Sequence, residues 1–231
     1  MAKRKQVEKK SDEVLIDVVE VREGAQDFVD KNRNLILGGL GALVLIVGGW
    51  IAYTQFIIGP KQREATEQMF QAQVQFERDS FALALTNPGG GYSGFLDIID
   101  GYKGTQAANL AKYYAGVSYL NLGQYQAAIS YLKDFKAKGS VLPIMKNGVL
   151  GDAYAEENDL AQALSYYKKA VSAGDNELLT PYYLKKVAML NERNGNLAEA
   201  LKAYQRIKDE YPTAPDAFDI DKYITRVTPK G

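Results

Sequence analysis

Residues 151–167 read GDAYAEENDLAQALSYY, and this stretch decides the fold. Each half carries small and large apolar residues at helical spacing, and the cluster Glu157-Asn158-Asp159 between them consists of residues that end helices. Gly151 in the first half and Ala163 in the second are small enough to let two antiparallel helices cross closely. The stretch therefore predicts a helix–turn–helix unit.

The same unit recurs along the chain. Three segments align in register on a shared alanine: Tyr125 to Ile129 on Ala128, Leu160 to Leu164 on Ala163, and Leu197 to Leu201 on Ala200. The steps between these alanines are 35 and 37 residues. A nearly constant step of this length predicts an all-α solenoid, in which each unit buries its apolar face against the next.

The pattern resembles the tetratricopeptide repeat (TPR), a pair of antiparallel helices about 34 residues long, over residues 109–213. The small residues of the family's helix crossings are present in all three repeats: Gly116, Gly151 and Ala188 in the first helices, and Ala128, Ala163 and Ala200 in the second. Three positions depart from the family pattern, namely Lys112, Asn147 and Asn191, which stand where the family often has an aromatic residue. The resemblance implies a protein-binding groove lined by the first helix of each repeat.

A second feature is the apolar run 34–58, NLILGGLGALVLIVGGWIAYTQFII, which is uncharged from Leu35 onward. A secretory signal has an apolar core of about 7 to 15 residues and a small-residue cleavage site, whereas this run is longer and follows 33 other residues. A core helix of a soluble domain would have a polar face. Because the run is apolar on all sides and exceeds the roughly 20 residues that cross a bilayer, it predicts an uncleaved single transmembrane helix.

The flanks of the run agree with a membrane helix. Basic residues bracket it and interfacial aromatic residues lie near its far end: Lys31, Arg33, Lys61, Arg63, Trp50 and Tyr53. Gly59-Pro60 predicts the end of the helix. Basic residues close to the run tie in number, but the N-terminal segment MAKRKQVEKK adds five basic residues against one acidic residue. We therefore expect a cytoplasmic N-terminus and a C-terminal domain on the other side of the membrane.

Composition excludes several classes of function. The 28 basic and 28 acidic side chains give a net charge of zero, so the chain lacks the positive excess that nucleic-acid binding requires. It has no cysteine and no histidine, which excludes thiolate nucleophiles, Cys/His zinc sites and triads that use histidine. We predict no catalytic residue, no metal site, no cofactor and no enzymatic activity. A carboxylate-dependent enzyme is the alternative from another class.

The chain divides into five predicted regions. Ile98 to Tyr102 matches Ile207 to Tyr211, which suggests a divergent first repeat ahead of the three clear ones, interrupted by the loop Thr86 to Tyr92. The loop contains three consecutive glycines but lacks the Lys-Ser/Thr and the preceding strand of a phosphate-binding loop. The regions are a cytoplasmic tail (1–33), a transmembrane helix (34–58), a divergent first repeat with a Gly-rich loop (61–105), TPR repeats (106–213), and a capping helix with tail (214–231).

The family's groove positions, mapped onto this chain, supply candidate protein-binding residues. The first cluster is apolar and lacks the Lys and Asn set by which some relatives hold a peptide carboxylate, so a clamp for a C-terminal tail is disfavoured. Such a groove accepts an amphipathic helix or an unfolded segment of a partner. The alternative occupant is the chain's own amphipathic helix, 61–79. The candidates are Leu110, Tyr113, Val117, Leu120, Asn121, Met145, Asp152, Glu156, Tyr182, Lys185, Met189, Glu192 and Arg193.

The transmembrane run has a candidate packing face. Gly38, Gly41, Gly48 and Ala52 can lie along one side of the helix and admit a neighbouring helix at close range. The plain alternative is that glycine is frequent in membrane helices.

The order of tail, membrane helix, repeats and capping helix resembles the YfgM-like ancillary subunits of the bacterial Sec translocon. That resemblance implies a single-pass protein of the bacterial inner membrane whose periplasmic domain binds translocon subunits and a membrane-anchored periplasmic chaperone. It further implies a non-catalytic scaffold that helps pass translocated proteins to chaperones. A general membrane-tethered TPR adaptor for envelope or cell-division complexes would share every sequence feature above.

Overall fold

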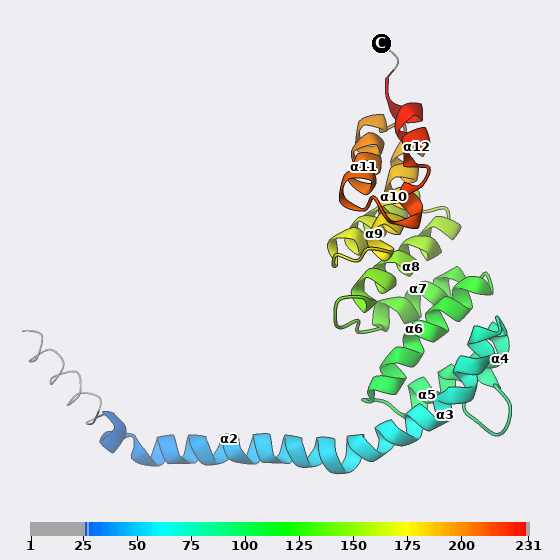
Figure 1. Ribbon diagram of the computed structural model, residues 1–231. Coiled ribbons are helices and arrows are strands. Elements are labelled where there is room, and N and C mark those ends of the chain that lie inside the picture. The colour runs from blue at the N-terminus through cyan, green and yellow to red at the C-terminus, as the bar shows by residue number, and fades with distance from the viewer. Residues whose placement is uncertain (1–25, 27, 230–231) are drawn as a thin grey trace, which may run out of the picture. The chain divides into compact units, whose positions relative to one another are not determined.

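The computed structural model describes residue 26 and residues 28–229, and all regular elements within them are helical, which confirms the all-α class (Figure 1). The chain forms two compact units, Met1–Gly59 and Pro60–Gly231. Most of the predicted N-terminal tail, residues 1–25 and 27, lies outside the described part. The elements are α2 (Arg33–Tyr53), η1 (Thr54–Ile58), α3 (Gly59–Glu77), α4 (Phe81–Thr86), α5 (Phe95–Gly101), α6 (Gln106–Asn121), α7 (Tyr125–Asp134), α8 (Leu142–Glu156), α9 (Leu160–Ser172), α10 (Leu179–Arg193), α11 (Leu197–Glu210), η2 (Pro215–Ala217) and α12 (Ile220–Val227).

The apolar run forms α2, which is 21 residues long and has no buried residue. Among the described residues, the helix that begins at Arg33 is the one candidate that could cross a membrane, judged by length and composition alone. A core helix of this chain would be covered by other elements, whereas Leu45 is 77% exposed and Trp50 is 67% exposed. Within its own unit, α2 therefore lacks the burial that is typical of a core helix.

The Gly59-Pro60 pair does not interrupt the helical backbone, so the predicted stop was wrong, although α3 does begin at Gly59 with Pro60 in its first turn. Gly59 has right-handed helical angles, φ −58° and ψ −53°, and its N–H donates to the carbonyl oxygen of Thr54 in the π-helical turn η1. In a regular α-helix, the ring of Pro60 would collide with the carbonyl group of Phe56, four residues earlier. The wider π turn just before the proline relieves this conflict while the backbone stays helical.

In the second unit, α3, α4 and α5 share an apolar core with α6. Ala65 of α3, Ala84 of α4, Phe95 of α5 and Ala111 of α6 are fully buried in it. Gln75 Nε2 of α3 donates to the carbonyl oxygen of Pro88 (3.0 Å), which ties the Gly-rich loop to this helix. The loop follows a helix, not a strand, and its three consecutive glycines all have positive φ. Its glycines therefore serve a tight left-handed path that other residues rarely adopt.

The next six helices form three antiparallel pairs, α6 with α7, α8 with α9, and α10 with α11, stacked in chain order (Figure 1). The small residues predicted at the helix crossings are where the helices come closest. A Cβ added at Gly116 would lie 2.5 Å from Leu132 Cγ, and one added at Gly151 would lie 2.4 Å from Tyr167 Cδ1. Glycine therefore sets the spacing inside the first two pairs, because no larger residue fits without a shift.

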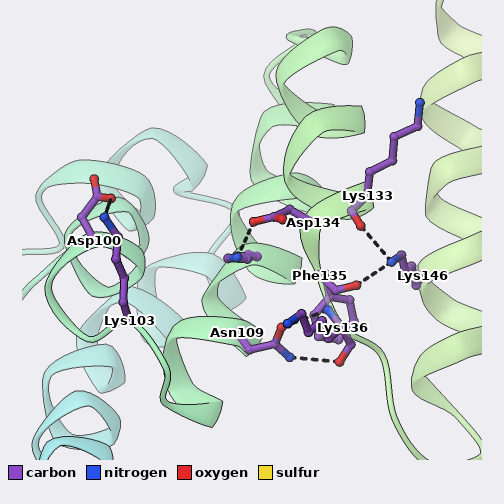
Figure 2. Close-up of polar contacts among 9 residues, drawn as sticks. Asp100, Lys103, Asn109, Lys133, Asp134, Phe135, Lys136 and Lys146 are labelled. Atoms are coloured by element: carbon purple, nitrogen blue, oxygen red, sulfur yellow. Dashed lines mark hydrogen bonds and ion pairs between the residues drawn. The ribbon is translucent and has the colours of Figure 1, made fainter.

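The connection from α7 to α8 is held by one side chain of α6 and one of α8 (Figure 2). The side chain of Asn109 of α6 makes two hydrogen bonds with the backbone of Lys136: its Oδ1 accepts from the Lys136 N–H (2.9 Å), and its Nδ2 donates to the Lys136 carbonyl oxygen (3.0 Å). Lys146 of α8 donates to the carbonyl oxygens of Lys133 (3.1 Å) and Phe135. These bonds satisfy the last carbonyls of α7, which would otherwise have no partner after the helix ends.

The C-terminal end of the stack is covered by α12. Ile220 and Val227 are 3% and 2% exposed and belong to the same apolar core as Tyr204 and Ile207 of α11. Arg226 of α12 forms an ion pair with Glu192 of α10 (2.6 Å). The helix thus covers the apolar face that the last repeat would otherwise leave exposed, as solenoid ends require.

Candidate protein-binding surface

The predicted groove residues lie on α6, α8 and α10, the first helices of the three pairs. α8 contacts both α6 and α10, and each of the three helices also contacts its own partner. Residues spaced by three or four along each helix share one face, so the candidates form rows that run from helix to helix.

The row on α6 is largely packed. Tyr113 is 9% exposed, and Leu110, Val117 and Leu120 are half-buried against the core that joins α6, α7 and α8. Asn121 is exposed, and its Nδ2 donates to the Val117 carbonyl oxygen of its own helix (2.9 Å). Burial raises the pKa of the Tyr113 hydroxyl to about 12. The α6 row therefore offers apolar edges and one amide to a partner.

The row on α8 mixes apolar and acidic residues. Met145 is half-buried against the core shared with α6 and α7, while Glu156 at the end of the helix is exposed. Asp152, between them, is 24% exposed at its side chain and contacts both α9 and α10. It is the polar centre of the surface.

The candidates on α10 separate into two groups. Tyr182, Met189 and Arg193 are exposed, with Tyr182 at 42% and Met189 at 50%. Lys185 instead pairs with Asp216 (3.2 Å) and Asp219 (3.8 Å). Glu192 accepts hydrogen bonds from the Tyr204 hydroxyl (3.1 Å) and from Arg226. Tyr182 and Met189 are therefore exposed on α10, whereas Lys185 and Glu192 are bound to residues of the segment 216–226 at the C-terminal end.

A partly buried ion pair joins α8 to α10. Lys186 Nζ contacts Asp152 Oδ1, and the Tyr167 hydroxyl donates to the same oxygen (2.7 Å). The Lys186 ammonium also lies 4.8 Å from the ring centre of Tyr182 and 5.4 Å from that of Tyr167. Burial lowers the pKa of Lys186, but the attraction of Asp152 and a hydrogen bond with Tyr182 outweigh it and raise that pKa overall. Lys186 thus stays charged beside its carboxylate.

Sequence reasoning missed Lys186. It follows Tyr182 by four residues and precedes Met189 by three, so helical spacing alone places it in the same row. Its partner Asp152 was among the candidates. The family mapping selected Lys185 instead, whose side chain lies on the neighbouring face of α10.

The chain's own helix 61–79 packs beside the start of the α6 row, where Leu110 is half-buried against the core that α3 shares, but it leaves the α10 part of the surface exposed. It forms α3, whose Ala65, Met69 and Ala72 are buried in the core that precedes and includes α6. The Gln62 side chain accepts from the Ala107 N–H at the start of α6 (3.0 Å). Because Tyr182 and Met189 stay exposed, the alternative in which α3 fills the groove is wrong for the α10 part of the surface.

A separate open depression of ≈550 Å³ lies on the outer side of α3. It is lined by Gln62, Arg63, Thr66, Glu67, Phe70 and Tyr92, the last from the Gly-rich loop. Within the described residues, no three His, Cys, Asp or Glu side chains lie close enough to hold a metal ion. Of the acidic candidates, Asp152 is bound to Lys186 and Tyr167, and Glu192 is bound to Tyr204 and Arg226.

Comparison with known protein families agrees with this architecture. A tetratricopeptide repeat family model matches residues 149–215, which span most of α8 through α11, and a second matches residues 110–138, which span most of α6 and all of α7. A search of curated proteins found no match. Residues 110–138 and 149–215 therefore match tetratricopeptide repeats, and such repeats suggest a protein–protein interaction scaffold.

Proposed function

We propose that this protein is a non-catalytic, membrane-anchored scaffold whose repeats bind other proteins beside the Sec translocon and help pass translocated proteins to periplasmic chaperones. The observation that carries the binding role is the exposed row of Tyr182, Met189 and Arg193 on α10, beside the ion pair of Asp152 and Lys186. Aromatic and methionine side chains that are left exposed along one helix are typical of protein-binding surfaces.

The proposed anchor is α2, a single membrane-spanning helix with the N-terminus in the cytoplasm and residues 60–231 in the periplasm. Its length, its uniformly apolar surface and its lack of buried residues support this role. Gly38, Gly41, Gly48 and Ala52 are proposed to face a neighbouring membrane helix.

The proposed binding groove runs along the first helices of the repeats. On α6 and α8 it uses the half-buried edges of Leu110, Val117, Leu120 and Met145 together with the exposed Asn121 and Glu156. Tyr113, Lys185 and Glu192 support it from within the packed structure.

A topology experiment tests the anchor first. Protease added to bacterial spheroplasts that make the full chain should degrade the region 60–231 while sparing the cytoplasmic tail. If that region stays intact in spheroplasts and is cut only in lysates, the proposed orientation and the periplasmic role are wrong.

Affinity purification from detergent-solubilised membranes then tests the partner set. Translocon subunits and a membrane-anchored periplasmic chaperone should be recovered with the wild-type chain and lost with a Tyr182→Ala, Met189→Ala double variant. Recovery of envelope-assembly or cell-division proteins without translocon subunits would contradict the translocon assignment and identify a general membrane-tethered adaptor.

A further inference from the structure

The carboxylate of Asp152 is engaged on one side only. The ammonium of Lys186 and the hydroxyl of Tyr167 both contact Oδ1, and Oδ2 makes no hydrogen bond. Among the described residues, Ser118 Oγ is the one fully buried side-chain nitrogen or oxygen without a hydrogen-bond partner. Oδ2 of Asp152 also lacks a partner but is not fully buried, so solvent reaches it. The surface therefore presents a free acceptor next to a partly exposed ammonium donor.

The surroundings of this pair are apolar or aromatic. Tyr182 and Met189 flank Lys186 along α10, and Val149 precedes Asp152 by three residues on α8. The two charges cancel, and each is about three-quarters buried, at 24% exposure for Asp152 and 28% for Lys186. A charged partner group would gain no net attraction here, whereas a neutral group that offers one donor and one acceptor would complement the pair.

The same molecule shows how an acceptor and a donor side by side recognise an extended backbone. The Asn109 side chain accepts from the N–H of Lys136 and donates to the carbonyl of the same residue, which directly follows the extended residue Phe135 at the end of α7 (Figure 2). The N–H and C=O of one extended residue point in a common direction, so a single acceptor–donor pair can bind both.

We propose that Asp152 Oδ2 and Lys186 Nζ bind the backbone N–H and C=O of one residue in an extended, uncharged, apolar segment of a partner protein, as presented by an unfolded polypeptide. The proposal rests on the proposed function and names the kind of segment that the scaffold takes. Tyr182 and Met189 accommodate the neighbouring side chains of the segment without fixing its sequence.

An amphipathic helix is a poorer match to this site. Its backbone N–H and C=O groups are already paired within the helix, so it has nothing to offer Asp152 Oδ2. A terminal carboxylate is a poorer match as well, because Lys186 is already neutralised by Asp152. An extended segment brings unpaired backbone groups that need partners once they leave water.

The test uses the full chain in nanodiscs and a fluorescent 12-residue peptide of Leu, Val, Ser and Thr, capped at both ends so that it carries no charge. A series of otherwise identical peptides carries one backbone N-methyl group at each position in turn. We expect one position, or two alternating ones, at which methylation weakens binding roughly 10-fold, the size of a lost charge-assisted hydrogen bond. Asp152→Ala should weaken binding of the unmethylated parent peptide by a similar factor. Peptide binding by this variant should no longer depend on methylation at that position.

The matched control is Asp134→Ala, which breaks an ion pair with Lys112 on another face of the solenoid and should leave peptide binding unchanged. Equal small effects of methylation at every position, or unchanged methylation sensitivity in Asp152→Ala, would overturn the proposal. So would tighter binding of a helix-forming amphipathic peptide or of a peptide with a free carboxylate. Methylation of the peptide needs no protein variant, so the result does not depend on Asp152→Ala folding normally.

Tyr182→Ala separates this proposal from the proposed function. Loss of binding with Tyr182→Ala but not with Asp152→Ala keeps the groove as the binding surface and refutes the backbone contact. Binding that neither variant affects would place the partner elsewhere and refute the proposed groove itself.

Discussion

Gly148 of α8 lies directly against the ring of Tyr183 of α10: a Cβ added at residue 148 would fall 1.8 Å from Tyr183 Cζ and 2.1 Å from its hydroxyl oxygen. Tyr183 is 5% exposed, and its ring stacks near that of Tyr167, with the ring centres 6.1 Å apart. The distance between the first helices of the last two repeats is therefore set by the absence of a side chain at residue 148. That spacing also allows Lys186 to reach Asp152 across the same helix contact.

Gly148→Ala should destabilise the solenoid, because its methyl group would overlap a ring that is packed on all sides. We expect a loss of about 1–3 kcal/mol in the free energy of unfolding, measured by chemical denaturation. Gly101→Ala is the matched control, since a Cβ there meets nothing within 4 Å and Gly101 is helical. The control should be neutral or stabilising by up to about 1 kcal/mol. Equal stability of the two variants would contradict the close helix contact.

The ion pair between Glu192 and Arg226 predicts an acid-sensitive C-terminal cap. The Arg226 guanidinium, with help from the Tyr204 hydroxyl, lowers the pKa of Glu192 below its ordinary value of 4.5, against the opposing effect of burial. A carboxylate with a lowered pKa contributes stability that is fully present above 4.5 and is lost as pH falls through the folded-state pKa. The protection of the α12 amides, which is their exchange rate corrected for the intrinsic rate at each pH, should therefore fall below pH 4.5.

Glu192→Gln should remove most of this acid dependence and speed α12 exchange already at neutral pH. The control is Glu199→Gln, because Lys202 also lowers the pKa of Glu199 but that pair is largely exposed at the surface. It should leave α12 exchange unchanged. If acid reduces the protection of the α12 amides equally in Glu192→Gln and in the wild type, a group other than Glu192 causes the acid sensitivity of α12.

Asn109→Ala should loosen the connection between α7 and α8. Both hydrogen bonds to the Lys136 backbone would be lost, which corresponds to about 1–2 kcal/mol at a partly exposed site. The direct measurement is hydrogen exchange of the Lys136 amide, which we expect to become at least about 10-fold faster. Asn121→Ala is the control, since the Asn121 side chain bonds only within its own helix. Unchanged exchange at Lys136 would mean that Lys146 alone holds the connection.

The parts of the fold that depend on local pattern could be read from the sequence. Gly116 and Gly151 were predicted at close crossings because the contact lies within one repeat and so returns at a constant step. The close contact at Gly148 was not predicted, because it is made with Tyr183 of the next repeat and because Gly148 is not one of the small residues that recur in each repeat. Repeat periodicity therefore fixes contacts inside a pair better than contacts between pairs.

Two adjacent lysines of α10 show a similar limit of the repeat pattern. Lys185 was placed in the groove, but Asp216 and Asp219, about thirty residues later, draw it to the cap. Lys186 was overlooked although Asp152, the residue 34 positions earlier that it pairs with, was a candidate. Helical spacing from Tyr182 and Met189 already places Lys186 in the groove row, a local signal that the family mapping did not use. The pairing of Lys185 with acids about thirty residues later is not contained in a local pattern.

Substitution of the glycines of α2 can separate membrane anchoring of the chain from its association with membrane partners. A Cβ added at Gly38, Gly41 or Gly48 meets nothing within 4 Å, so larger residues there disturb no contact within the described structure. Replacing Gly38, Gly41 and Gly48 by Leu should leave the chain in the membrane fraction after alkaline extraction, because the run becomes more apolar. If these glycines face a neighbouring helix, co-purification of membrane partners should fall at least about 10-fold, since the backbones can no longer approach closely. The substitutions Leu37→Ile, Val44→Leu and Val47→Leu change bulky apolar residues at other positions of the helix and serve as controls. Unchanged co-purification in the glycine variant would leave α2 as a tether without a packing face.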